Sequence, residues 1–414
     1  MSIGISCPVT GPPFFPVVES TLSDARSDIV SRLSPLGCEL VPVTGALCRV
    51  SSEPLCSTRP RPSYNQSARD GFALAAQPYA IDAGWAVFQL TGEVAAGCVD
   101  ERTLQSGEAV RIMTGAMVPH STARVVPFEI CRESGAAVRV PSEALDEPQQ
   151  FIRRRGSVAR EGVELVAPGT RLQPDHLMML AESGSRQVPV FRRPSVAVVC
   201  TGSELVEPGS AIRPGRKISG NGVLLSSLLR SGGAVCHGVV TVEDRVNAVL
   251  SVLEKLLEND VDLIITTGGM GPGKFDLMEQ VFARLGGELV YNRLRVRPGK
   301  STLFGLVGGK PFFALPGPPP AVRILFHELV GPAVARLQGM RDDGGLAEAV
   351  LRGSVPMQQK GYPCLKGGVA RLVCGRLQVR KADQMESVNA VIHFGTQRCG
   401  AGDTVRVRLV GPLS

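Results

Sequence analysis

Apolar residues follow two different rhythms along the chain, and the change between them divides it into segments. Between residues 195 and 337, short apolar runs alternate with stretches in which apolar residues recur every three or four positions. Strands are predicted at 196–200, 235–242 and 263–265, and helices at 222–230, 246–257, 277–285 and 321–337. Strands that alternate with amphipathic helices are typical of a parallel-type sheet covered by helices on both faces, a three-layer α/β domain.

The flanking segments have a β-like rhythm. Short apolar runs separated by Gly and Pro lie at 85–90, 109–113, 123–128 and 137–140, and again at 349–355, 368–373, 377–379, 391–394 and 404–409. Closely spaced runs of this kind favour small β-rich domains on both sides of the α/β segment. Helices are also expected at 20–36 and 176–182, with a short strand pair at 41–50, and Asp244 is expected to cap the helix at 246–257.

Length and composition support several domains and narrow the range of ligands. A chain of 414 residues exceeds the roughly 250–300 residues that one core supports. The net charge of +7 comes mainly from short, scattered arginine clusters, which suit a small anion better than a nucleic acid. No apolar run reaches the length of a membrane span, and eleven cysteines without C-x-x-C pairs are typical of a reducing cytoplasm.

One glycine-rich loop is the strongest local signal. The apolar run 263–265 leads into Gly268, Gly269, Gly271 and Gly273, and the loop ends at Asp276. Glycines at the carboxyl end of a buried strand let backbone N–H groups approach an anion such as phosphate. The residues alone also allow a simpler interpretation, in which the loop is only a tight turn and Asp276 only caps the following helix.

Other polar residues recur at predicted strand ends and loops. They are Asp70, Thr114, Glu204, Asp244 and Asp276. Carboxylates that converge in one place could hold Mg²⁺ together with a substrate phosphate, and nearby arginines could hold anions. The five histidines form no recognisable cluster, so neither a histidine base nor a histidine metal site is proposed.

Six short motifs occur in an order that resembles a known family. They are Asp-Gly-Phe-Ala73, Thr-Gly-Ala116, Thr-Gly-Ser-Glu-Leu205, Gly-Gly-Met-Gly-Pro-Gly-Lys-Phe-Asp276, Arg-Pro-Gly-Lys300 and Leu-Pro-Gly317. Together they resemble the molybdopterin molybdenumtransferases, the MoeA and gephyrin E-domain family, over nearly the whole chain. Each motif alone is a weak signal, and their shared order makes the resemblance specific.

The resemblance implies an α/β multidomain fold in four parts. These are an elongated first domain in two segments (1–65 and 148–192), an inserted β domain (66–147), a molybdopterin-binding α/β domain (193–339) and a small C-terminal β-barrel-like domain (340–414). It also implies a homodimer with an intersubunit site, whereas the composition indicates a cytoplasmic protein without a nucleic-acid or membrane partner.

The implied activity is that of a transferase in molybdenum cofactor biosynthesis. It inserts molybdate, or tungstate in its place, into adenylylated molybdopterin with Mg²⁺ and releases AMP. By resemblance, the catalytic residues are Asp276, Glu204 and Asp70, and the metal ligands are Glu204 and Asp276. The implied substrate-binding residues are Thr114, Asp244, Gly268, Gly269, Gly271, Gly273, Arg293, Arg297, Pro298, Lys300, Lys366 and Ser387. Asp70 and Thr114 would come from the partner subunit.

The sequence departs from the family pattern at several positions. Gly271 and Ala321 stand where serine is usual, Ser203 and Val158 where aspartate is usual, and Pro318 where asparagine is usual. These departures leave two alternatives to the active enzyme. One is a divergent paralogue that binds molybdopterin as a carrier or regulator, and the other is a scaffold of the gephyrin kind, for which no extra N-terminal domain is present.

Overall fold

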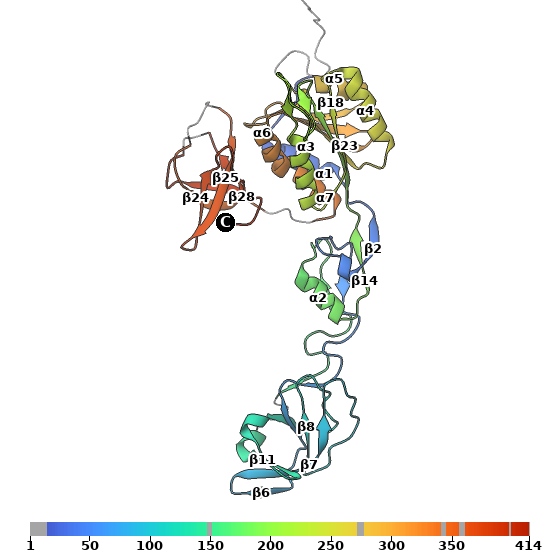
Figure 1. Cartoon of the computed structure of the whole chain (residues 1–414), viewed down its shortest axis with the longest axis vertical. Coiled ribbons are helices and arrows are strands. Elements are labelled where there is room, and N and C mark those ends of the chain that lie inside the picture. The colour runs from blue at the N-terminus through green and yellow to red at the C-terminus, as the bar shows by residue number, and fades with distance from the viewer. Residues whose placement is uncertain are drawn as a thin grey trace, which may run out of the picture.

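The protein is an extended molecule with most of its mass at one end (Figure 1). The computed structural model describes residues 15–146, 151–270, 277–340, 345–355, 361–396 and 399–413. An α/β body and a small barrel lie side by side at one end, a narrow waist follows, and a β-rich unit forms the far end (Figure 1). No helix in these ranges is both long and apolar enough to span a bilayer.

The α/β body is built on a six-stranded sheet in the order β18-β15-β19-β23-β22-β20. Its strands are β15 (Ser195–Thr201), β18 (Val235–Val242), β19 (Leu263–Thr267), β20 (Glu288–Tyr291), β22 (Leu303–Val307) and β23 (Lys310–Leu315). The first four in spatial order run parallel, and β22 and β20 complete the sheet with antiparallel pairing. The predicted parallel-type sheet is therefore confirmed, with an antiparallel margin.

Helices cover both faces of this sheet, as expected for three layers. One core contains side chains from α3 (Asn221–Ser231), α6 (Pro319–Leu325) and α7 (Gly331–Leu337), and the opposite core contains α4 (Val246–Glu258) and α5 (Leu277–Arg284). The predicted helix at 321–337 is not uniform, because a π-helical turn, η4 (Phe326–Val330), joins α6 to α7. Such turns insert one extra residue per turn and often occur at functional or structural junctions.

The first helix packs on this body. Helix α1 (Leu22–Arg32) buries Ala25 and Ile29 in the same core as α3 and α7. Its first turn is capped by Thr21, whose side chain accepts from the Asp24 N–H at 3.2 Å. The helix ends earlier than predicted, because Pro35 disfavours helical geometry in the residue before it. Strand β1 (Glu19–Ser20) pairs with β21 (Arg293–Leu294), so the described start of the chain lies against the α/β body. The division into four domains remains a proposal. Helix α1, which that division assigns to the first domain, packs on the α/β domain at 193–339.

Three antiparallel strand pairs form the waist. The chain leaves through β2 (Cys38–Pro42), η1 (Val43–Gly45), β3 (Leu55–Cys56) and β4 (Gln66–Ser67) and returns through β12 (Ile152–Arg153), β13 (Glu164–Val166), α2 (Pro174–Glu182) and β14 (Gln187–Phe191). Each outgoing strand pairs with a returning one. The expected local strand pair at 41–50 is therefore wrong, because β2 finds its partner in β14, far along the chain.

A two-pronged ion pair fixes the waist to the body. Arg192, just after β14, donates to both carboxylate oxygens of Asp262 at 2.9 and 2.6 Å. The N–H of Ser195 also donates to Asp262 at 2.7 Å. Asp262 directly precedes β19, so the returning chain is fastened at the start of the central strand.

The far unit is a seven-stranded sheet with a core on each face. Its strands are β5 (Gly71–Leu74), β6 (Ala80–Asp82), β7 (Trp85–Val94), β8 (Glu108–Ile112), β9 (Arg124–Pro127), β10 (Arg132–Ser134) and β11 (Ala137–Pro141), with short turns η2 (Phe128–Ile130) and η3 (Ser142–Leu145). Four of them were predicted from the apolar runs.

The C-terminal segment closes into a barrel in the order β24-β26-β25-β27-β28, which confirms the expected barrel-like fold. Its strands are β24 (Ala347–Leu351), β25 (Cys364–Val373), β26 (Arg376–Lys381), β27 (Ala390–Phe394) and β28 (Thr404–Leu409). A small apolar core fills it. The remaining pair, β16 (Leu205–Val206) with β17 (Lys217–Ile218), belongs to a loop of the α/β body.

A buried carboxylate fastens the barrel to the body. Glu328 lies on η4 with a side chain only 2% exposed. Its Oε1 lies 2.9 Å from His393 Nε2 on β27 and accepts from Arg408 Nε on β28 at 3.1 Å. Arg26 on α1 approaches Oε2 at 3.9 Å. We refer to these four residues as the Glu328 cluster, since one carboxylate joins three parts of the fold.

Candidate functional site

The carboxyl ends of the four parallel strands meet at one edge of the α/β sheet. The residues after β18 include Asp244, those after β15 include Ser203 and Glu204, those after β19 begin with Gly268, and those after β23 lead to Gly317. In open α/β sheets, ligands bind outside such strand ends. Asp244, Glu204, Gly268 and Gly269 are therefore brought to one edge, although their loops lie far apart in the chain.

The glycine loop has a backbone that only glycine adopts with ease. Gly268 and Gly269 have φ values of +92° and +67°. A Cβ on Gly268 would lie 2.3 Å from the carbonyl oxygen of Thr201 at the end of β15. The loops after β15 and β19 therefore touch, and a side chain here would push them apart. The predicted residues Gly271, Gly273 and Asp276 lie outside the described residues.

Glu204 lies in the loop after β15 and is already paired. Its Oε1 lies 2.8 Å from Lys217 Nζ, and its side chain is 41% exposed. The hydrogen bond from Lys217 is the main cause that lowers the pKa of Glu204, helped by its own backbone N–H and the charges of Lys217 and Arg216. The carboxylate is thus held ionised at neutral pH, with the exposed ammonium group of Lys217 beside it.

The backbone of Asp244 is hydrogen-bonded to the loop after β15, which carries Ser203 and Glu204. Its N–H donates to Ser203 Oγ at 3.3 Å. The expected capping of α4 by Asp244 is wrong, because Arg245 occupies the N-cap position and no side chain bonds the first turn. The linkage to Ser203 explains why the chain extends one residue further before the helix begins.

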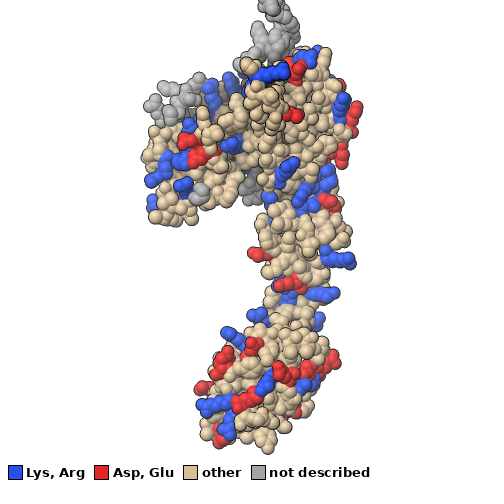
Figure 2. Space-filling view, in the orientation of Figure 1, with Lys and Arg blue, Asp and Glu red and all other residues tan. Residues whose placement is uncertain are grey.

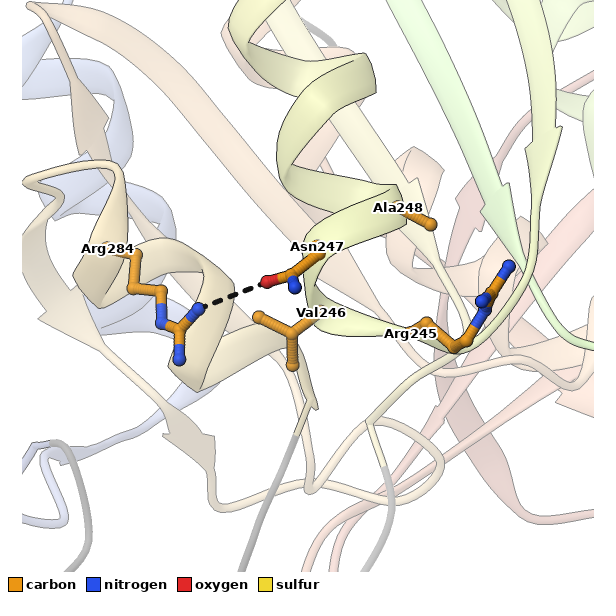
Figure 3. A pocket seen from close by; sticks show the side chains of 5 residues that line it. All are labelled: Arg245, Val246, Asn247, Ala248 and Arg284. Carbon is orange, nitrogen blue, oxygen red and sulfur yellow. Dashed lines mark hydrogen bonds between the residues drawn. The ribbon is translucent and has the colours of Figure 1, made fainter.

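A shallow pocket lies beside Asp244, at the start of α4. It has a volume of about 430 Å³ and is lined by Arg245, Val246, Asn247, Ala248 and Arg284. In Figure 3, Arg284 from α5 reaches toward Asn247, whose Oδ1 accepts from it at 3.3 Å, while Arg245 extends away from them. None of these residues was predicted to bind a ligand.

Asp70 and Thr114 form a close pair in the far unit. The Thr114 N–H and hydroxyl both donate to Asp70 Oδ1, at 2.6 and 2.8 Å. Both hydrogen bonds lower the pKa of the fully exposed Asp70 carboxyl, and the bond from the Thr114 backbone N–H has the larger effect. Both residues belong to the β-rich end of the molecule, far from the strand-end edge of the same chain (Figure 1). One subunit therefore does not bring Asp70 next to Glu204.

Of the predicted cationic residues of the body, Arg297 and Lys300 contact the chain that leads into the barrel. Arg293 is exposed on β21, and Arg297 follows in a loop that bonds the barrel, since its N–H donates to Pro363 O at 3.0 Å. Pro298 follows Arg297 through a cis peptide. Lys300 lies 5.7 Å from the ring centre of Tyr362. Figure 2 shows Lys and Arg side chains on both the body and the barrel, with Asp and Glu on each of them as well.

The two predicted residues of the barrel lie apart from the glycine loop in the sequence and on different elements. Lys366 is half-buried on β25, where it pairs in register with Ile392. Ser387 is exposed in the loop before β27. Strand β25, which carries Lys366, also contacts the Arg297 loop, because the Leu365 N–H donates to Arg297 O at 2.6 Å.

Asn221 is a polar residue of this edge that the sequence analysis missed. It is the first residue of α3, and its Nδ2 donates to Thr267 Oγ1 at 3.0 Å and to Gly317 O at 2.8 Å. Its Oδ1 is buried without a hydrogen-bond partner. A single Asn at a helix start is normally interpreted as a cap. The signal that could have revealed it is its place in the strand–loop–helix rhythm that also carries Glu204.

Comparison with protein families and known proteins gives matches over most of the chain. Residues 20–184 match the family described as MoeA N-terminal region (domain I and II), and residues 197–336 match the family described as probable molybdopterin binding domain. The molybdopterin molybdenumtransferase of a Nostoc species is 31% identical over 316 residues, which covers 73% of this chain and 70% of that protein.

Further relatives and a solved structure agree with these matches. The molybdopterin molybdenumtransferase of Staphylococcus epidermidis is 31% identical over 300 residues, 72% of this chain and 70% of that protein. The crystal structure of a molybdopterin biosynthesis moea protein from Pyrococcus horikosii superimposes with a TM-score of 0.79 at 25% identity, and covers 95% of this chain and 100% of that one.

Proposed function

Because the chain belongs to the molybdopterin molybdenumtransferase family, a family of transferases in molybdenum cofactor biosynthesis, we propose that it inserts molybdate into adenylylated molybdopterin and releases AMP. The observation that carries this proposal is the strand-end edge. There the loop after β15, which carries Glu204, contacts the Gly268–Gly269 turn on one side and the Asp244 loop on the other. Such an edge offers backbone N–H groups for phosphate, with carboxylates and a lysine within reach.

The roles of the residues follow from their chemistry. The glycine loop would hold the substrate phosphate, and Lys217 would neutralise it when it turns from Glu204. Arg293, Arg297 and Lys300 would hold anionic groups, since guanidinium and ammonium groups bind oxyanions strongly. Lys366 and Ser387 would receive molybdate, or tungstate, which has the same charge and shape. In the proposed reaction a water oxygen attacks phosphorus, the P–O anhydride bond breaks and AMP leaves. The two dithiolene sulfurs replace one molybdate oxygen, which leaves with the two thiol protons as water.

The described residues fit a resident Mg²⁺ in part. Glu204 supplies carboxylate oxygens, the donors that Mg²⁺ prefers, but one of them is bonded to Lys217 at 2.8 Å. Within the described ranges, which stop short of Asp276, no group of three His, Cys, Asp or Glu is arranged for a metal. We propose that Glu204 and Asp276 would hold the ion together. When bound, it would withdraw charge from the phosphate oxygens.

We propose a cytoplasmic homodimer in which Asp70 and Thr114 of one subunit complete the site of the other. Two observations support this. The pair is exposed and ordered by its own hydrogen bonds, yet it lies at the opposite end of the molecule from Glu204 (Figure 1). An extended subunit can present this end to a partner. Co-expression of Asp70→Asn with Glu204→Gln subunits should restore activity that neither homodimer has, and no restoration would exclude a shared site.

Activity is tested by incubation with adenylylated molybdopterin, Mg²⁺ and either molybdate or tungstate. The wild type should release AMP and retain the metal. Glu204→Gln and Asp276→Asn should each lower AMP release by at least about a hundredfold while pterin binding is largely kept. Glu207, an exposed carboxylate three residues after Glu204, provides the control variant Glu207→Gln, which should behave as the wild type.

One observation favours a second function. Glu204 is already paired with Lys217, and the family's serine and aspartate are replaced at Gly271 and Ser203. A chain with these features could bind molybdopterin as a carrier or regulator without turnover. Tight pterin binding by the wild type without AMP release would favour this function over the enzyme.

A further inference from the structure

The orientation of the Asn221 amide is fixed by its neighbours. Nδ2 donates to Thr267 Oγ1 at 3.0 Å and to the Gly317 carbonyl at 2.8 Å. A carbonyl oxygen can only accept, so the NH₂ group must face Gly317 and the amide cannot be turned over. The oxygen, Oδ1, therefore points elsewhere.

Oδ1 lies buried at the strand-end edge with no donor to meet it. Thr267 directly precedes Gly268, and the Gly317 backbone lies against Gly268, since a Cβ on Gly317 would be 3.8 Å from Gly268 Cα. The amide is thus enclosed by the loops that follow β19 and β23. A buried acceptor without a donor is costly and uncommon, and ligand sites are among the places where such a group is kept.

The chemistry of this oxygen selects the part of the substrate that it meets. Oδ1 accepts and does not donate, so it would repel the oxygens of phosphate or molybdate. Its match is an N–H donor. The substrate of the proposed function carries such donors on two ring systems, the pterin and the adenine, each with an amino group.

We propose that Asn221 Oδ1 accepts a hydrogen bond from a ring or amino N–H of the substrate heterocycle, while Nδ2 holds the loops after β19 and β23 together. Asn221 is then a substrate-binding residue that orients the heterocycle relative to the phosphate at the glycine loop. This inference rests on the proposed function, because it takes the heterocycle from the proposed substrate.

The test compares three ligands by isothermal titration: molybdopterin, AMP and inorganic pyrophosphate. In Asn221→Ala, affinity for either molybdopterin or AMP should fall about tenfold, equivalent to about 1.4 kcal/mol, while pyrophosphate binding stays within twofold. Loss for molybdopterin alone assigns the pterin, and loss for AMP alone assigns the adenine. The matched control is Asn259→Ala, whose side chain bonds Lys255 O at the end of α4; it should change none of the three.

Two outcomes would overturn the inference. They are unchanged binding of all ligands by Asn221→Ala, and an equal loss for pyrophosphate, which would mean that Asn221 only shapes the loops. Should this variant not fold, Asn221→Asp keeps an acceptor and loses the donors. Its affinity for the heterocycle relative to pyrophosphate should then stay within threefold of the wild type, and a tenfold drop in this ratio would contradict the inference. A wild type that binds neither molybdopterin nor AMP would instead refute the proposed function.

Discussion

Replacement of Glu328 by glutamine tests how firmly the barrel is attached to the body. Glutamine has nearly the same shape but no charge. Burial opposes the ionised form of Glu328, but the hydrogen bond and charge of His393 and the charge of Arg408 outweigh it, so the pKa of Glu328 lies below its usual value. Glu328→Gln removes the buried carboxylate charge that faces Arg408, whose side chain is 11% exposed.

The expected cost can be taken from the burial of the partners. Removing one member of a buried ion pair costs about 3–5 kcal/mol, because the other charge remains out of water. Arg26 is 22% exposed and His393 14%, so water reaches part of the cluster and the low end, about 3 kcal/mol, is expected. The matched control is Glu386→Gln, which removes a half-buried, water-accessible partner of Arg380 within the same barrel and should change stability less than Glu328→Gln.

The assay is urea unfolding followed by two signals. The helical signal of far-UV circular dichroism comes mainly from the body, which contains α1 and α3 to α7. The fluorescence of Trp85, the single tryptophan, reports the far unit. Glu328→Gln should lower the midpoint seen by circular dichroism and leave the Trp85 transition unchanged. A shift below about 0.5 kcal/mol, or an equal shift of both signals, would refute the reasoning.

The sign of the pH dependence follows from the same pKa. A carboxyl with a lowered folded-state pKa stabilises the protein above its unfolded value, and the stabilisation is lost as pH falls below it. For Glu328 the loss should therefore begin below about pH 4.5, the ordinary glutamate value. Glu328→Gln should remove this part of the acid dependence, so its stability should converge with that of the wild type in acid.

Three further predictions concern buried groups. Burial lowers the pKa of His327 from 6.5 to about 4. The stability that this neutral histidine contributes above pH 6.5, about 3 kcal/mol, should therefore be lost as pH falls toward 4. The urea midpoint of His327→Gln should depend less on pH than that of the wild type. The Tyr291 hydroxyl is buried without a partner, so Tyr291→Phe should leave the melting temperature unchanged or raise it, and a loss above about 1 kcal/mol would contradict this. Gly268→Ala should cost at least about 1–2 kcal/mol from its positive φ and abolish pyrophosphate binding, whereas Gly238→Ala, with open space around it, should do neither in the same titrations.

Elements with strong periodicity were predictable from the sequence. The apolar positions of α4 follow the helical period, and the continuous run before Gly268 gave β19, because a strand buried on both faces needs apolar residues throughout. The helix cap was not predictable. Asp244 has the right side chain for a cap, but its backbone is drawn to Ser203, a contact between loops that no local pattern records.

The partners of distant segments could not be read from the sequence. Strand β2 has the pattern of any short strand, and nothing in it identifies β14 as its neighbour. The apolar face of α1 indicates burial but not which core it enters. In the candidate site, sequence motifs indicated Glu204 and Gly268, whereas Asn221 belongs to none of the six motifs, and its buried, unpartnered oxygen distinguishes it in the structure.

The waist has a consequence for how this architecture can vary. The chain goes out and comes back alongside itself, with paired strands β2 and β14, β3 and β13, and β4 and β12 at successive steps. At each strand pair the outgoing and returning segments are neighbours, so the far unit is an insertion whose two ends meet at the α/β body. Such an insertion can be shortened at any of the three strand pairs and closed by a turn. It can also be exchanged for another domain whose two ends lie close together. The architecture is therefore modular. Evolution or an engineer can change the length of the waist while the α/β body keeps its fold.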